Sequence, residues 1–369
     1  MRFVTDLSKG ILGAPDSSEL WEEIVSQIPD AVFLKNDVKI LCPVAGHGTE
    51  ADVIVRRMRA LGRSIKDIQN SIYLIDKYRV FTHDLIDRGY KNVITADFTE
   101  WETDMKFDVV IGNPPYQKPT NTEKDENNRQ GSFWWEIVCT AKPFVKDNGV
   151  LAMVIPTSIF STGGFGKSTH KVTQLRNSGF ELSNIWSNVN EHFDVGISIS
   201  AFIATRSTAK DCNIVDKKQV VTLDYDYPIP FTLDKETISI VKKCYNFTNK
   251  WKFKEVDSSG PTDKVVKING GRYKQYSKLF VGKSQDTEHR AQTMVLDADA
   301  DLNNVSSAFM SKIFKFMFVS LGGESGQSST GILQSLPFVD ISRRWSDKEI
   351  YTHFGLTQEE IEYIEANVK

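Results

Sequence analysis

The tetrapeptide Asn113-Pro114-Pro115-Tyr116 is the part of the sequence best suited to chemistry. It directly follows an apolar run at 107–111 that predicts a buried strand. Asn113 and Pro114 each precede a proline, which holds both residues in extended backbone. A turn made stiff in this way can aim the Asn113 side-chain oxygen and the Pro114 carbonyl at one ligand, while Tyr116 offers an aromatic face. Two acceptors beside a ring suit a planar exocyclic amine.

A loop with two glycines, from Pro43 to Glu50, follows the first predicted strand. Gly46 and Gly48 allow the backbone to approach a ligand closely. The helix that begins after them favours a carboxylate or phosphate at its amino terminus. A Gly-x-Gly pattern alone is not specific, so a ligand-binding role for this loop depends on motifs at other positions.

Two acidic residues follow the next two predicted strands. Asp76 stands where a carboxylate accepts hydrogen bonds from ribose hydroxyls in nucleoside-binding α/β folds. Asp97 can pair with an adenine amino group, and Phe98 can pack against the adenine face. Each position taken singly is equally typical of a helix cap or a loop. Because all of them follow successive strands, at the sheet edge where ligands bind, they together predict one nucleoside pocket.

Alternating strand and helix patterns in the first half predict a doubly wound α/β domain that can position these residues. The last two expected strands complete a seven-stranded sheet. The expected strands are 38–42, 71–75, 92–95, 107–111, 149–155, 181–186 and 198–205, and the expected helices are 49–61, 77–88, 133–145 and 168–177.

Three domains are expected along the chain: a catalytic domain at 1–206, a recognition domain of mixed structure at 207–335 and a helical segment at 336–369. The regular alternation is lost after Asp211. Two capping boxes, Ser346 with Glu349 and Thr357 with Glu360, predict two helices near the carboxyl end. We expect these helices to pack back on the catalytic domain.

The charge distribution points to a nucleic-acid partner. The net charge is −3 over 369 residues, but residues 241–290 carry 12 Lys and Arg against 5 Asp and Glu, a local charge of +7, together with seven Tyr, Phe and Trp. A solvated basic face over an ordinary core is an equally common explanation of such a segment. The candidate DNA-binding residues are Lys252, Lys254, Arg272 and Lys274.

Composition also excludes several classes of protein. The longest apolar run is far shorter than the roughly 20 residues of a membrane span, and the amino terminus lacks the apolar core of a signal peptide. The four cysteines are scattered, without the close pairs of a zinc site. We therefore expect a cytoplasmic protein of a bacterial or phage-infected cell, with no membrane association and no metal.

The order of these motifs, with the Ala96-Asp97-Phe98 tripeptide and the run from Phe107 to Tyr116, resembles the N6-adenine DNA methyltransferases of restriction–modification type in their gamma arrangement. The resemblance implies a seven-stranded methyltransferase sheet. It is strongest from Ile40 to Tyr116. Residues 333–337 and 354–364 are similar to the closing segment of those enzymes. Cys42 and Glu50 depart from the pattern, since the family usually has Asp and a large aromatic residue there.

The resemblance implies roles for individual residues. Pro43, Gly46 and Gly48 would line the pocket for S-adenosyl-L-methionine, Asp76 would hold its ribose, Asp97 its adenine amino group and Phe98 its adenine face. Asn113 and Pro114 would accept from N6 of the target adenine, Pro115 would keep the turn rigid, and Tyr116 would stack on the extruded base. Phe193 falls where some members place a second stacking ring.

The partners implied are double-stranded DNA and a cognate restriction endonuclease on a separate chain. Several alternatives stay open, because RNA-base and protein-glutamine methyltransferases can share Asn-Pro-Pro-Tyr. An N4-cytosine DNA methyltransferase commonly carries Ser in place of Asn113. A catalytically idle DNA-binding subunit belongs to a different class altogether. The long basic region after the seventh strand favours a DNA enzyme.

Overall fold

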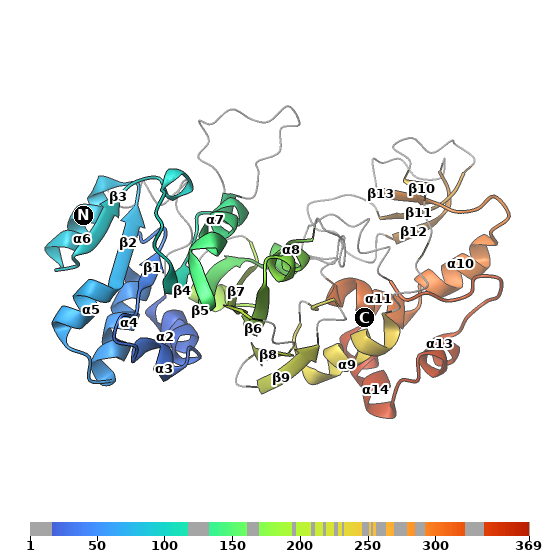
Figure 1. Cartoon of the computed structure of the whole chain (residues 1–369). Coiled ribbons are helices and arrows are strands. Elements are labelled where there is room, and N and C mark those ends of the chain that lie inside the picture. The colour runs from blue at the N-terminus through green and yellow to red at the C-terminus, as the bar shows by residue number, and fades with distance from the viewer. Residues whose placement is uncertain are drawn as a thin grey trace. The chain divides into compact units, whose positions relative to one another are not determined.

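A computed structural model describes most of the chain in two units (Figure 1). The first comprises 1–157 and 175–222, and the second comprises 158–174 and 223–369. The described residues are 17–116, 133–160, 170–193, 197–207, 211–216, 219–224, 228–230, 232–245, 251, 254–255, 263–268, 279–284, 292–321 and 336–368.

The first unit is built on a mixed sheet whose strands lie in the order β3-β2-β1-β4-β5-β7-β6-β8-β9. Strands β1 to β5 are parallel, whereas β7 is antiparallel to both β5 and β6. The expected methyltransferase-like α/β sheet is confirmed, with one strand reversed and two more added. The strands are β1 Ile40–Cys42, β2 Ile72–Asp76, β3 Asn92–Thr95, β4 Phe107–Gly112, β5 Val145–Pro156, β6 Phe180–Trp186, β7 Ile199–Arg206, β8 Asp211–Asp216 and β9 Gln219–Asp224.

Helices cover both faces of this sheet because alternate strand residues point to opposite sides. On one side, the cluster around Ile40 and Val109 takes in Trp21 of α2 and Ile54 of α4. Elsewhere in the unit, η1 packs on α7, and α7 packs on β5. The helices of this unit are α2 Ser18–Ser26, α3 Asp30–Phe33, α4 Thr49–Ala60, α5 Ile65–Ser71, α6 Arg79–Asp87, η1 Phe98–Glu100, α7 Phe133–Ala141, η2 Lys142–Phe144, η3 Thr157–Phe160, α8 Lys171–Asn177 and η4 Asn190–His192, with η3 and part of α8 assigned to the second unit.

Asp108, within the motif run that precedes the tetrapeptide, has a structural role at the amino end of β4. Its buried carboxylate accepts hydrogen bonds from Lys35 Nζ at 2.7 Å, Lys146 Nζ at 2.7 Å and the Lys39 N–H at 3.0 Å. Burial alone raises the pKa of Asp108, but these donors outweigh it and the pKa lies below its usual value. The carboxylate thus links strands β4 and β5 to the segment before β1, at the end of β4 remote from Asn113.

The second unit packs helices and a small antiparallel sheet around its own core. The strand order is β10-β13-β11-β12. Trp251, Phe309 and Phe314 lie at the centre of the core, where their ring centroids are 4.9 to 6.3 Å apart. The elements are α9 Lys235–Cys244, β10 Lys254–Glu255, β11 Lys264–Ile268, β12 Leu279–Lys283, β13 Gln292–Val295, α10 Leu302–Phe309, α11 Lys312–Ser320, α13 Asp347–His353 and α14 Gln358–Asn367.

The carboxyl-terminal helices belong to this second unit and share its core, and their expected packing on the catalytic domain stays a prediction. Ile350 of α13 and Ile364 of α14 are fully buried in the core that contains Phe314. Glu360 joins α14 to α9 through Lys243 Nζ at 2.7 Å and Ser239 Oγ at 2.7 Å. These apolar side chains and the buried carboxylate find partners on α9 and α11, so the segment completes a core within its own unit.

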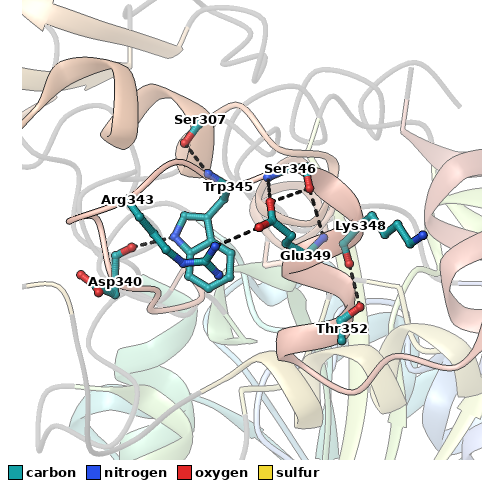
Figure 2. A network of polar contacts seen from close by, with 8 residues as sticks. All are labelled: Ser307, Asp340, Arg343, Trp345, Ser346, Lys348, Glu349 and Thr352. Carbon is teal, nitrogen blue, oxygen red and sulfur yellow. Dashed lines mark hydrogen bonds and ion pairs between the residues drawn. The ribbon is translucent and has the colours of Figure 1, made fainter.

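Both predicted capping boxes are present. Figure 2 shows the first, where Ser346 Oγ and N–H both donate to Glu349 Oε2, at 2.7 and 2.8 Å. Arg343 donates to Glu349 Oε1 at 2.9 Å and lies 3.6 Å from the centre of the Trp345 ring. Trp345 is anchored by hydrogen bonds to Ser307 and to the Asp340 carbonyl. The network joins α10 to the start of α13.

The hydrogen bonds to Glu349 predict an acid-sensitive contribution to stability. Those from Ser346, then that from Arg343, lower the pKa of Glu349 from 4.5 to about 2. A group with a lowered pKa in the folded state stabilises the fold above its ordinary pKa, and this contribution is lost as the pH falls from about 4.5 to about 2. Glu349→Gln should therefore lower the melting temperature at neutral pH, with a difference from the parent that shrinks toward pH 2.

The matched control is Glu359→Gln, which removes one exposed carboxylate on α14. Its melting curve is expected to stay close to that of the parent protein across the same pH range. A pH-independent difference for Glu349→Gln would contradict the assignment of this network.

Candidate functional site

The site lies where the order of the parallel strands reverses, between β1 and β4. Strands added on one side of this point are β2 and β3, and on the other side β5. In open α/β sheets, ligands bind beyond the carboxyl ends of the strands at such a reversal. The sequence motifs follow β1, β2, β3 and β4 in turn, so the topology brings them to the same edge.

The loop after β1 is held by hydrogen bonds along its backbone. Ala45 N–H donates to the Ile75 carbonyl at 2.9 Å, and Gly46 N–H donates to Asp76 Oδ2 at 3.0 Å. Gly48 N–H closes a turn on the Ala45 carbonyl at 2.6 Å. These bonds dock the loop onto the end of β2.

Gly48 is required at its position for two reasons. It caps α4 with φ +70°, in the left-handed region that favours glycine. A Cβ on Gly48 would also lie 2.7 Å from Leu85 Cδ2 on α6. The close approach seen at Gly48 is thus to α6, and the predicted approach of this loop to a ligand stays a prediction.

The loop also touches the strand that leads to the tetrapeptide. A Cβ on Gly112, the last residue of β4, would lie 3.4 Å from Pro43 Cδ. Since β1 and β4 are neighbours in register, the Pro43 motif and the Asn113 motif start side by side.

Asp76 joins the loop to the start of α6 through its two carboxylate oxygens. Oδ2 accepts from the Gly46 N–H, and Oδ1 accepts from the Tyr78 N–H at 2.8 Å. The residue is 2% exposed, and this burial raises the pKa of Asp76 although the two backbone hydrogen bonds oppose it. The carboxylate lines the pocket described below and also orders the loop beside it.

Asp97 and Phe98 lie at the start of η1. Asp97 Oδ1 accepts from the N–H and the hydroxyl of Thr99, at 3.0 and 2.7 Å, and Oδ2 is 4.0 Å from Lys77 Nζ. The ring of Phe98 is buried and its centroid lies 5.9 Å from that of Phe144. Asp97 therefore acts as a turn-forming residue with its second oxygen toward the Lys77 ammonium.

One pocket brings these positions together. Its volume, including the part open to solvent, is about 370 Å³. Predicted residues in its wall are Asp76, Asp97, Phe98 and Pro115, and those that sequence reasoning missed are Val44, Lys77, Tyr78, Phe133 and Ile137. A lysine beside three aromatic rings and two carboxylates makes this wall suitable for a planar, polar-edged ligand.

Some of the pocket residues that sequence reasoning missed follow a recognisable sequence pattern, and others do not. Phe133 and Ile137 lie four positions apart on α7, which places both on one face of that helix. That spacing was a usable signal. Lys77 lies directly after Asp76 and its ammonium lies 5.3 Å from the Tyr78 ring centroid and 5.9 Å from that of Phe133. Nothing in the sequence pattern distinguishes it from a surface lysine.

The tetrapeptide leaves the end of β4 in an irregular segment. Pro114 and Pro115 are buried, whereas Asn113 and Tyr116 are partly exposed. Tyr116 packs against the core cluster that also contacts Phe193, which follows η4. The two rings proposed for stacking thus rest on one core, and Pro115 is the tetrapeptide residue in the pocket wall.

The basic segment of the second unit is only partly described. Lys252, Arg272 and Lys274 lie outside the described residues, and of Lys254 the backbone alone is described, opposite Val295 in the β10–β13 pair. Tyr245 and Trp251 are buried, and Trp251 Nε1 donates to the Pro337 carbonyl at 3.0 Å. These two rings therefore serve the core, contrary to a reading of all the aromatic residues here as a contact surface.

Some of the basic charges are also used within the fold. Lys243 pairs with Glu360, and Lys264 Nζ donates to the Ala300 carbonyl at 2.6 Å. Among the described residues, no group of three or more His, Cys, Asp or Glu is arranged to hold a metal ion. The described helices include none with the length and apolar character of a membrane span.

Comparison with known proteins finds a family model that matches part of the chain. Residues 49–191 match the family model described as Eco57I restriction-modification methylase. The match begins directly after Gly48 and contains Asp76, Asp97 and the tetrapeptide at 113–116.

A curated relative supports the same assignment. The type II methyltransferase M.CvrRI of Paramecium bursaria Chlorella virus XZ-6E is 41% identical over 80 residues, which are 20% of this chain and 21% of the relative. The match thus spans about a fifth of that protein's length.

Two of the solved structures similar to this chain have low sequence identity to it. A class I S-adenosylmethionine-dependent methyltransferase structure from Listeria monocytogenes is 16% identical and covers 58% of this chain and 70% of its own, with a TM-score of 0.45. The match to the methyltransferase subunit of a type I restriction–modification system from Streptococcus thermophilus covers 57% of this chain and 50% of that subunit, at 16% identity and a TM-score of 0.43. The resemblance to restriction–modification methyltransferases is confirmed by the family model and the viral relative, and residues 49–191 are the part of this chain that matches the Eco57I restriction-modification methylase family.

Proposed function

We propose that this chain is an S-adenosyl-L-methionine-dependent DNA methyltransferase that modifies N6 of adenine in duplex DNA. The observation that carries the proposal is the single pocket whose wall joins Asp76, Asp97 and Phe98 to Pro115 of the tetrapeptide. A nucleoside-like cofactor in that pocket would end beside the residues suited to an exocyclic amine.

The pocket fits the adenosyl part of this cofactor. Buried Asp76 supplies acceptor oxygens at the end of β2, where ribose hydroxyls bind in α/β folds. Asp97 Oδ2 can accept from the adenine amino group, and Phe98 and Ile137 supply apolar surface. The loop that contains Gly46 and Gly48 contributes Val44 to the same wall. When bound, the cofactor supplies a methyl group on a positively charged sulfur.

The tetrapeptide would act on the acceptor base. A base inside a duplex cannot reach such a pocket, so it must rotate out of the stack, at a cost of a few kcal/mol. Stacking on Tyr116 and Phe193 would offset part of that cost. Asn113 and Pro114 would accept hydrogen bonds from the two N6 hydrogens.

The two acceptors would direct the N6 lone pair at the methyl carbon. Transfer would form an N–C bond at N6 in place of the C–S bond of the methyl donor, whose electron pair would stay on sulfur, and N6 would release one proton to solvent. The chemistry needs no covalent enzyme intermediate. Alignment of nitrogen, carbon and sulfur then provides much of the rate acceleration.

The second unit is proposed as the part that contacts DNA. Its 147 residues from 223 to 369 follow the last strands of the sheet, and the segment 241–290 carries a charge of +7. Such a segment attracts phosphates irrespective of sequence. A cognate nuclease, where one acts with this protein, is proposed to be a separate chain.

A labelling experiment tests the proposal against its rivals. The purified chain should transfer labelled methyl groups to unmodified duplex DNA, and the label should be recovered as N6-methyladenine after digestion to nucleosides. Recovery as N4-methylcytosine, in RNA or on glutamine of a polypeptide would replace the proposal with the corresponding alternative. No label in any of these acceptors would favour a non-catalytic DNA-binding subunit.

A further inference from the structure

A side chain that follows α6, that of Arg88, holds the loop between β1 and α4. Arg88 follows α6, and its Nη1 donates to the His47 carbonyl at 2.6 Å. The other guanidinium nitrogen, Nη2, bonds to Asp52 of α4. Asp52 in turn accepts from the Tyr90 hydroxyl at 2.7 Å. The guanidinium thus spans the loop and the first turns of α4.

The bond to His47 fixes one peptide plane. Its carbonyl accepts from Arg88, and the N–H on the other side of the same peptide, that of Gly48, donates to the Ala45 carbonyl at 2.6 Å. Because a peptide group is planar, two opposed hydrogen bonds leave it little freedom to rotate. Gly48, whose φ is +70°, could otherwise move the loop easily.

Two further contacts hold the same loop on α6. The His47 ring meets the Phe81 ring edge to face, with centroids 4.8 Å apart. Gly48 faces Leu85 across too little space for a Cβ. Arg88 is the polar member of this set, and its planar fork can serve a carbonyl and a carboxylate at once, which an ammonium does less well.

We infer that Arg88 is a positioning residue that orients the His47–Gly48 peptide and thereby shapes the loop wall of the cofactor pocket. This inference rests on the proposed function, since the ligand in question is S-adenosyl-L-methionine. Arg88 itself is absent from the lining of the pocket. It acts through the backbone of the loop.

The test compares the affinity for S-adenosyl-L-methionine of the full-length chain and its variants by calorimetry, well below the unfolding temperature. Arg88→Ala should weaken binding about 10-fold, in line with the loss of a hydrogen bond to a charged donor. Arg88→Lys should give an intermediate affinity. Amide hydrogen exchange at residues 45–49 should be faster in Arg88→Ala.

Arg56→Ala is the matched control, because Arg56 forms an ion pair of 2.8 Å with Glu22 and is 54% exposed. It should leave both the affinity and the exchange of the loop unchanged. An Arg88→Ala protein that binds as tightly as the parent, with unchanged exchange at 45–49, would overturn the inference alone. A parent protein that binds no S-adenosyl-L-methionine would overturn the proposed function, and the cofactor role of Arg88 with it.

Discussion

Asn113→Ala should reduce methyl transfer to adenine by about 10²–10³-fold or more, the range observed when one preorganised group at a reacting atom is removed. The side-chain oxygen of Asn113 is one of only two acceptors assigned to the target amine. Without it, the N6 lone pair stays delocalised into the ring for more of the reaction. Single-turnover transfer of labelled methyl groups would measure the loss.

Cofactor binding should survive the same substitution. Asn113 is partly exposed and lies outside the lining of the adenosyl pocket, to which the tetrapeptide contributes Pro115. Asn113→Asp keeps an acceptor oxygen at the same place, so its activity should exceed that of Asn113→Ala. If Asn113→Ala transferred methyl groups as fast as the parent protein, the role proposed for the tetrapeptide in the mechanism would be wrong.

Much of the first unit could be predicted from the sequence because its strands are short apolar runs bounded by clear turn signals. Strand β3 was predicted with its observed ends, and β2, β4 and β6 within one residue. The helix expected at 133–145 ends earlier, at Ala141, where Pro143 cannot continue the backbone hydrogen bonds. The bounds of these strands could therefore be predicted because they depend on residues close by in the sequence.

The edge of the sheet could not be predicted in the same way. Strands β8 and β9 extend the first sheet, and β8 pairs with β6 through Asn184 and Ile185. The loss of strand–helix alternation after Asp211 suggested a domain boundary at 206, whereas the boundary between the units falls at 222. An added edge strand needs only backbone hydrogen bonds, which leave little pattern in the side chains.

In the site, too, some residues could be predicted from nearby sequence, whereas others depend on tertiary contacts. The positions after each strand were visible because strand ends are local features. The dual role of Asp76, the ammonium of Lys77 in the pocket wall and the bond from Arg88 to His47 all depend on neighbours distant in the sequence. Likewise, the sequence pattern around Trp251 does not show that the Pro337 carbonyl accepts its N–H and that the ring belongs to the core.

Asp76→Ala should weaken binding of S-adenosyl-L-methionine by about two orders of magnitude, because it removes two functions at once. It deletes the acceptors proposed for the ribose, and it leaves the Gly46 and Tyr78 N–H groups without their carboxylate partner. A buried donor left unsatisfied costs about 1–3 kcal/mol. We therefore also expect a lower free energy of unfolding, by about 2 kcal/mol, in urea titration.

Asp76→Asn separates the two functions. Its remaining oxygen can still accept from Tyr78 N–H, but an amide NH₂ facing the Gly46 N–H places two donors together. Calorimetry should place its affinity between those of the parent and Asp76→Ala. Asp87→Ala, at an exposed position of α6, is the control for loss of a carboxylate and should bind as the parent does. If Asp76→Ala is destabilised yet binds the cofactor normally, the carboxylate serves the loop alone and the ribose site lies elsewhere.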